Sequence, residues 1–156
     1  MSYINEFGSF VTFGIGEGVE TANRSDSPYA DPTHCIVVDI DYDKYGLPRA
    51  NAGTGFGRGI SKIPAGAIIE EVEFFVTKEG ATKTATLNIG VSEKDGTVID
   101  ADGLAAGIAT SAGVAFGEGA LVNGQLAEAG YITAAIATGT ASDLAGLKGK
   151  IVVRFL

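Results

Sequence analysis

The feature that most constrains the fold is an alternation of apolar and polar residues between Ile63 and Ile99. In its first half, four apolar side chains are expected to share one strand face: Ile68, Val72, Phe74 and Val76. Three polar side chains fall largely on the opposite face: Glu71, Glu73 and Thr77. Because successive side chains of a strand point to opposite sides, this pattern predicts a strand with one buried and one solvated face.

A second strand of the same kind follows Lys78-Glu79-Gly80, where we expect a tight turn with a positive φ at Gly80. Its apolar face is Ala85, Leu87, Ile89 and Val91, and its polar face is Thr84, Thr86 and Asn88. Asp95-Gly96 is a hairpin signal, after which a third strand begins at Thr97. The whole segment is therefore predicted to form one antiparallel sheet with one buried face.

Strand patterns recur on both sides of this segment. His34 to Tyr42 places five residues on one face: His34, Ile36, Val38, Ile40 and Tyr42. Tyr131 to Thr138 is a strand of small residues, and in the last strand Ile151, Val153 and Phe155 point inward while Lys150 and Arg154 point outward. Asp100 to Gly103 is expected to be a turn, and Asp143 to Lys148 a short helical turn. Many short strands separated by Gly, Pro and Asp turns predict an all-β fold, an antiparallel two-sheet sandwich of jelly-roll type.

The chain is expected to divide into an N-terminal segment and loop, residues 1–33, and a β-sandwich domain, residues 34–156. The N-terminal segment carries a cluster of apolar residues: Tyr3, Ile4, Phe7, Phe10 and Phe13. One interpretation is a first strand of the sandwich. The other is an arm that packs on a neighbouring chain, because aromatic side chains contribute strongly to interfaces.

Composition excludes several function classes. A formal charge of −8, from 19 acidic and 11 basic residues, argues against a nucleic-acid partner, since phosphate binding needs clustered Lys and Arg. The longest uncharged stretch, Gly103 to Gly117, is too short for a membrane span, and the first residues lack the pattern of a signal peptide. The single cysteine, Cys35, cannot form an internal disulfide. We expect a soluble protein.

The residues offer little catalytic chemistry. Asp39, Asp41 and Asp43 are spaced as in a calcium loop, but Lys44 and Ala50 stand where an EF-hand needs Gly and Glu. A solvated strand face is the preferred interpretation, and calcium binding is the alternative. His34 and Cys35 are adjacent in a strand pattern, so their side chains should diverge, and so should those of Glu70 and Glu71. We therefore predict no enzyme, no catalytic residue, no metal and no cofactor.

Three stretches carry a resemblance to a known family. They are Ile63 to Thr77, Ala85 to Ala106 and Gly119 to Phe155, within residues 60–156. Their key marks are Ile63-Pro64-Ala65-Gly66, the Asp100 to Gly103 turn and Gly130-Tyr131-Ile132-Thr133. This part resembles small β-rich structural proteins of tailed bacteriophages, above all the capsid decoration (cement) proteins on the outside of the head. The N-terminal third has no such likeness.

The resemblance implies a jelly-roll-like fold, homotrimers near the symmetry axes of the shell, and a major capsid protein as the partner. It also implies a location on the outer capsid surface of the virion after synthesis in the host cytoplasm. A receptor- or carbohydrate-binding module of a head or tail fibre is the alternative function. The absence of Trp, which often forms platforms for sugars, favours cement.

Overall fold

The computed structural model describes residues 34–49 and 62–156, and the N-terminal segment 1–33 and the glycine-rich stretch 50–61 lie outside the described residues. The elements, in chain order, are β1 (His34–Asp41), α1 (Tyr42–Tyr45), β2 (Lys62–Ile63), β3 (Ile69–Lys78), β4 (Thr86–Ser92), β5 (Val98–Ala109), β6 (Gly113–Phe116), β7 (Gly130–Thr138), the 3-10 helix η2 (Ala141–Leu144) and β8 (Lys148–Phe155). Among these elements, no helix is long or apolar enough to cross a membrane.

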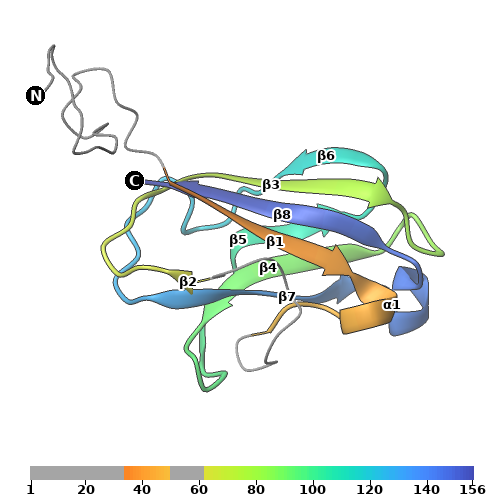
Figure 1. Ribbon diagram of the computed structural model, residues 1–156, viewed down its shortest axis with the longest axis horizontal. Coiled ribbons are helices and arrows are strands. Elements are labelled where there is room, and N and C mark those ends of the chain that lie inside the picture. The colour runs from red at the N-terminus through yellow and green to blue at the C-terminus, as the bar shows by residue number, and fades with distance from the viewer. Residues whose placement is uncertain (1–33, 50–61) are drawn as a thin grey trace, which may run out of the picture. The chain divides into compact units, whose positions relative to one another are not determined.

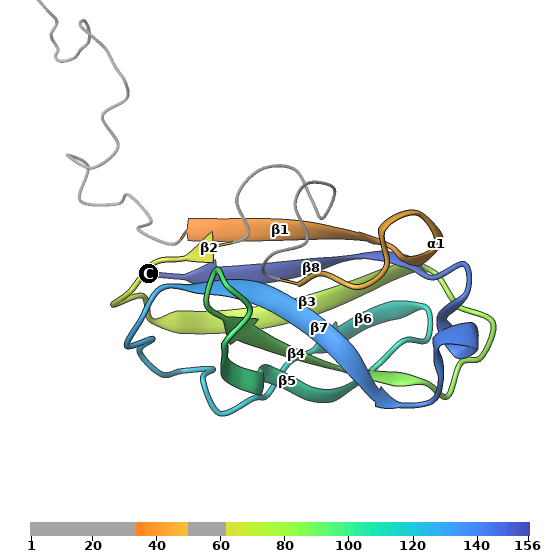
Figure 2. The same ribbon diagram turned by 90° about the horizontal axis from the view of Figure 1, so that it is seen from below.

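The strands form two antiparallel four-stranded sheets that face each other as layers (Figures 1 and 2). Sheet A has the order β1-β8-β3-β6, and sheet B has the order β2-β7-β4-β5. The first strand pairs with the last, β2 with β7, β3 with β6, and β4 with β5. Such nested pairs, folded over into two sheets, define an eight-stranded jelly roll. The predicted all-β sandwich of jelly-roll type is thereby confirmed.

The core lies between the two sheets and is built from the alternating residues. Val72, Phe74 and Val76 of β3 are buried against Leu87, Ile89 and Val91 of β4, with Ile151, Val153 and Phe155 of β8 beside them. These nine positions were predicted to point inward. Burying them removes the apolar face of each sheet from water, which is the main favourable contribution to folding.

One part of the prediction is wrong, because β3 and β4 do not form a hairpin. They belong to opposite sheets, so the chain crosses from one layer to the other through residues 79–85. Gly80 does not have the positive φ expected of a turn glycine. Its backbone instead packs closely on η2, where an added Cβ would lie 2.6 Å from the Asp143 carbonyl oxygen.

Two other local predictions fail because of irregular pairing. A register shift between Ile69 and Glu71 moves Ile69 into the core and leaves Ile68 41 % exposed. Asp100 to Gly103 lies inside β5 and does not end the strand. There the ladder advances from Val91 to Ile89 along β4 but from Asp100 to Ala105 along β5, which places three extra residues in β5 as a wide bulge. The hairpin at Asp95-Gly96 is confirmed, with φ 97° at Gly96.

Asp143 forms hydrogen bonds that connect two loops at one end of the sandwich. Its carboxylate accepts the Thr140 backbone N–H at 2.7 Å and the Thr82 hydroxyl at 2.9 Å, which joins the β7–β8 connection to the β3–β4 connection. These bonds favour the charged form and lower the pKa of Asp143, with the Thr140 N–H as the largest cause. Asp143 is also part of the capping box of η2, which begins two residues earlier than the helical turn expected from sequence.

We predict that the fold loses stability in acid, in part through Asp143. A carboxyl whose pKa is lowered by folding stabilises the protein above its ordinary pKa of 3.8 and loses this effect as the pH falls through the lower folded value. Asp143→Asn should lower the melting temperature at pH 7 and should flatten its decline between about pH 5 and pH 2. Glu128→Gln, at the other end of β7, is the control. Identical pH profiles for wild type and Asp143→Asn would contradict the prediction.

Candidate interaction surface

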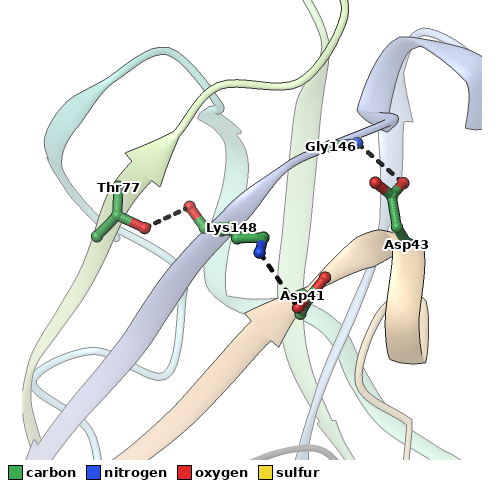
Figure 3. A network of polar contacts seen from close by, with 5 residues as sticks. All are labelled: Asp41, Asp43, Thr77, Gly146 and Lys148. Atoms are coloured by element: carbon green, nitrogen blue, oxygen red, sulfur yellow. Dashed lines mark hydrogen bonds and ion pairs between the residues drawn. The ribbon is translucent and has the colours of Figure 1, made fainter.

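The three aspartates that suggested calcium each have a protein partner, and Figure 3 shows those of Asp41 and Asp43. Asp41 Oδ2 lies 3.7 Å from Lys148 Nζ, and the Asp43 carboxylate accepts the Gly146 backbone N–H at 2.9 Å. Asp39 Oδ1 lies 2.5 Å from Lys150 Nζ. Lys148 and Lys150 are the residues directly opposite Asp41 and Asp39 in the β1–β8 ladder. The alternating acids therefore match the alternating lysines of β8 and fix the register of the two strands.

The other residues with catalytic potential are not brought together. His34 and Cys35 are both exposed at the start of β1, and the His34 ring lies against Phe155 with 5.6 Å between ring centroids. Glu70 is exposed, whereas Glu71 accepts a hydrogen bond from Arg154 at 3.0 Å. Within residues 34–49 and 62–156, no three His, Cys, Asp or Glu side chains gather in a group that could hold a metal ion.

Arg154 is the centre of an ionic cluster on the outer face of sheet A. Its Nη1 lies 3.0 Å from both Glu71 Oε1 and Glu73 Oε1. The Glu73 side chain is only 12 % exposed, and within the described residues the closest cation to its Oε1 is Arg154 Nη1. The neighbouring carboxylates, Glu73 first, raise the pKa of Arg154. A carboxylate this deeply buried depends on its cation.

Apolar side chains interrupt this charged face. They lie on all four strands of sheet A and are here named the outer patch: Val37, Phe75, Val114, Phe116 and Val152. Val152 is 8 % exposed, and Glu73 of β3 stands between Val152 and Phe116. Val152 stands opposite Val37, and Phe75 stands opposite Val114. Phe116 and Val114 are 56 % and 50 % exposed. Because an antiparallel sheet with a solvated face normally carries polar residues there, exposed apolar side chains indicate a contact surface.

A shallow groove adjoins the outer patch where the two sheets open. Its volume is about 270 Å³, and it runs between the edge strands β5 and β6. The lining on the β5 side consists of Ala105 to Ala109, with Gly107 and Ile108 among them, and Ala115, Phe116 and Glu118 close the other side. Phe116, Ile108 and the charged Glu118 are the long side chains of this lining, and the other residues are Ala and Gly.

The sequence contained a signal for the outer patch that the alternation analysis missed. In three strands an apolar residue stands next to another one, at Val37-Val38, Phe74-Phe75 and Val152-Val153. The outward-facing member of each pair, Val37, Phe75 or Val152, breaks the alternation of its strand. Only the ladder register shows that these breaks fall on one face, with Val37 directly opposite Val152. The predicted interface residues Tyr3, Ile4, Phe7, Phe10 and Phe13 lie outside the described residues.

No family model matches the chain, and no curated protein matches it. Among solved structures, a chain in the capsid of Ralstonia phage GP4 has the same fold, with a TM-score of 0.54 and 20 % identity over 83 % of this chain and 87 % of that chain. A chain in the cyanophage Pam1 capsid asymmetric unit aligns over 99 % of this chain and 98 % of that chain, with a TM-score of 0.48 and 16 % identity. One in the acidic stable capsid structure of Helicobacter pylori bacteriophage KHP30 gives a TM-score of 0.47 and 13 % identity over 79 % and 86 %.

We predict that Arg154 and Glu73 are energetically coupled. Arg154→Leu should lower the free energy of unfolding, because it leaves a buried carboxylate without its cation. Adding Glu73→Leu should recover much of this loss, and urea denaturation of the two single variants and the double variant measures the coupling. Lys83→Leu is the control, since its pair with Glu79 is exposed (73 % for the Lys83 side chain). Additive effects of the two substitutions would contradict the coupling.

Proposed function

We propose that this protein is a structural component of a phage virion, a decoration (cement) protein that binds the outside of the head and stabilises the shell. The observation that carries the proposal is the jelly-roll fold shared with a chain of the Ralstonia phage GP4 capsid. The alignment covers similar shares of both chains, so the two chains are of similar length. A jelly roll alone serves many functions, which is why the surface must support the proposal as well.

The described surface suits a protein that works by contact and not by catalysis. Four of its acids pair with bases across the strands of sheet A, and the outer patch presents apolar side chains for protein contact. We propose a non-enzymatic role without a cofactor. A protein that binds only the assembled shell stabilises that state by mass action, and this needs no chemistry.

We propose that the N-terminal segment attaches the protein to the shell. Residues 1–33 would form the arm that contacts the major capsid protein, with Tyr3, Ile4, Phe7, Phe10 and Phe13 as its apolar anchors. The sandwich of residues 34–156 would remain on the outer surface, and copies would associate as homotrimers near the symmetry axes. A terminal segment that orders on binding can cover a large area of its partner. Each buried aromatic anchor contributes about 1 to 3 kcal/mol.

A fibre module for receptors or carbohydrates is the competing function. A sugar platform needs aromatic side chains that gather on one surface. In the described part of the chain, the exposed aromatic residues among the large apolar side chains are Tyr45 and Phe116. Tyr45 lies in α1, which directly follows β1, and Phe116 lies on β6. Strands β1 and β6 are the opposite edges of sheet A. This separation favours the cement role.

Deletion of residues 1–13 tests the attachment. The truncated protein should keep the β-sheet circular dichroism spectrum of the full chain, because its sandwich strands begin at His34. It should bind undecorated heads at least about tenfold more weakly, as expected from the loss of one or more aromatic anchors. Binding is measured by co-sedimentation with the heads. Substituting Ser for Phe7, Phe10 and Phe13 in the full-length chain is the matched variant.

Two outcomes would contradict the proposal in different ways. Unchanged binding by the truncated, folded protein would move the attachment surface to the sandwich. Failure of the full-length chain to bind DNA-filled heads, with binding to a glycan or a host-cell surface instead, would support the fibre module and overturn the cement role.

A further inference from the structure

We infer that β6 is the strand through which two copies of this chain pair edge to edge. In the described part of the chain, β6 pairs with β3 on one side and has no strand on the other (Figure 1). The N–H and C=O groups on the free side of an edge strand can form a ladder with another strand. What distinguishes β6 is the absence of the features that normally prevent this pairing.

The other three edge strands are protected. β1 carries the charged Asp39 and Asp41, and β2 has only two residues, one of them Lys62. β5 is broken by three register shifts against β4. Charges, shortness and bulges are the usual devices that keep edges from pairing. β6 is four residues long, twice the length of β2, and its sequence Gly-Val-Ala-Phe has no charge, no proline and no register shift against β3.

The surroundings of β6 also permit a close approach. The side of the groove that β5 forms consists mostly of alanine and glycine, including the exposed Ala106 and Gly107. The outward residues beside β6 on sheet A are Phe75, opposite Val114, and Glu73, opposite Phe116, so the outer patch continues onto the strand at Phe75. A chain with a net charge of −8 repels its own copies, and β6 itself adds no charge to that repulsion. Glu73 is paired with Arg154, whose charge offsets its own.

The occupant that fits best is a second β6, because the strand complements itself. In an antiparallel pair with the two-fold axis at Ala115, Val114 of one copy stands opposite Phe116 of the other. The two-fold axis generates this pair twice, and both copies of the pair lie on the outer face of sheet A. In the single chain the Val114 and Phe116 side chains are half exposed there. Aromatic residues opposite β-branched residues are favourable cross-strand pairs. In the same register Glu118 stands opposite Ala112, so no two charged residues stand directly opposite each other, although the Ala112 N–H donates to Glu79 Oε2 at 2.8 Å.

Such a contact is isologous and two-fold, so it cannot by itself close a ring of three. It is therefore separate from the trimer contact proposed above, and the two can be distinguished by mass. If both exist, the full-length chain forms pairs of trimers. If only the β6 contact exists, it forms dimers.

The test places a charge on β6, because charges protect the other edge strands from pairing. Val114→Lys places a lysine on β6, and Val98→Lys is the matched control, because Val98 is 62 % exposed on the bulged edge strand β5 and the charge change is the same. Sedimentation equilibrium of the full-length chains should show concentration-dependent pairing of the wild type. Val114→Lys should weaken this pairing at least about tenfold, as expected for a charge placed in a ladder. Val98→Lys should pair like the wild type.

Amide hydrogen exchange gives a second readout that does not depend on the variants folding. In the wild type, protection of the β6 amides should increase with protein concentration, whereas protection of β4 amides inside sheet B should not change. Pairing that is equal in wild type and Val114→Lys would overturn the inference. So would a wild type that never pairs at any concentration. A trimeric mass unchanged by Val114→Lys would support the trimer and overturn the β6 contact.

Discussion

Strand β8 is the element on which the rest of the sandwich depends. It is the last strand in the sequence, yet it lies in the interior of sheet A between β1 and β3. Every residue of β1 from His34 to Asp41 has a partner on β8, and the pair Lys150–Asp39 is separated by 111 positions in sequence. Bringing such distant segments together costs loop entropy before any contact is made. The apolar and ionic contacts of β8 must therefore offset this cost together, which makes the sheet cooperative.

The two faces of β8 show how both kinds of contact are combined. Ile151 and Val153 are fully buried on the inner face, and they supply most of the stabilisation. Lys148, Lys150 and Arg154 stand on the outer face opposite the acids of β1 and β3. Exposed pairs of this kind contribute little free energy, but a register slipped by two residues would keep only one of the two Lys–Asp pairs between β1 and β8. The inner face thus drives folding, and the outer face selects one register.

The sequence patterns predict the content of the core better than its connections. Alternation identifies Val72, Phe74, Leu87 and Ile89 as buried, because side-chain direction in a strand is a local property. It cannot tell that β3 and β4 lie in different sheets, since a crossing loop and a tight turn both use glycine and polar residues. The direction of Ile68 and Ile69 depends on a bulge, and a bulge is set by the partner strand β8.

The same reasoning explains why a contact surface is harder to predict than a core. Asp100 to Gly103 has the residues of a turn, but the structure uses them to bulge an edge strand. In the sequence, Val37, Phe75 and Val152 are isolated breaks in the alternation of three separate strands. Only the ladder registers show that all three lie on the outer face of sheet A. An interface is defined by residues from several strands at once. It therefore becomes visible only after the register is known, and in this chain β8 determines that register.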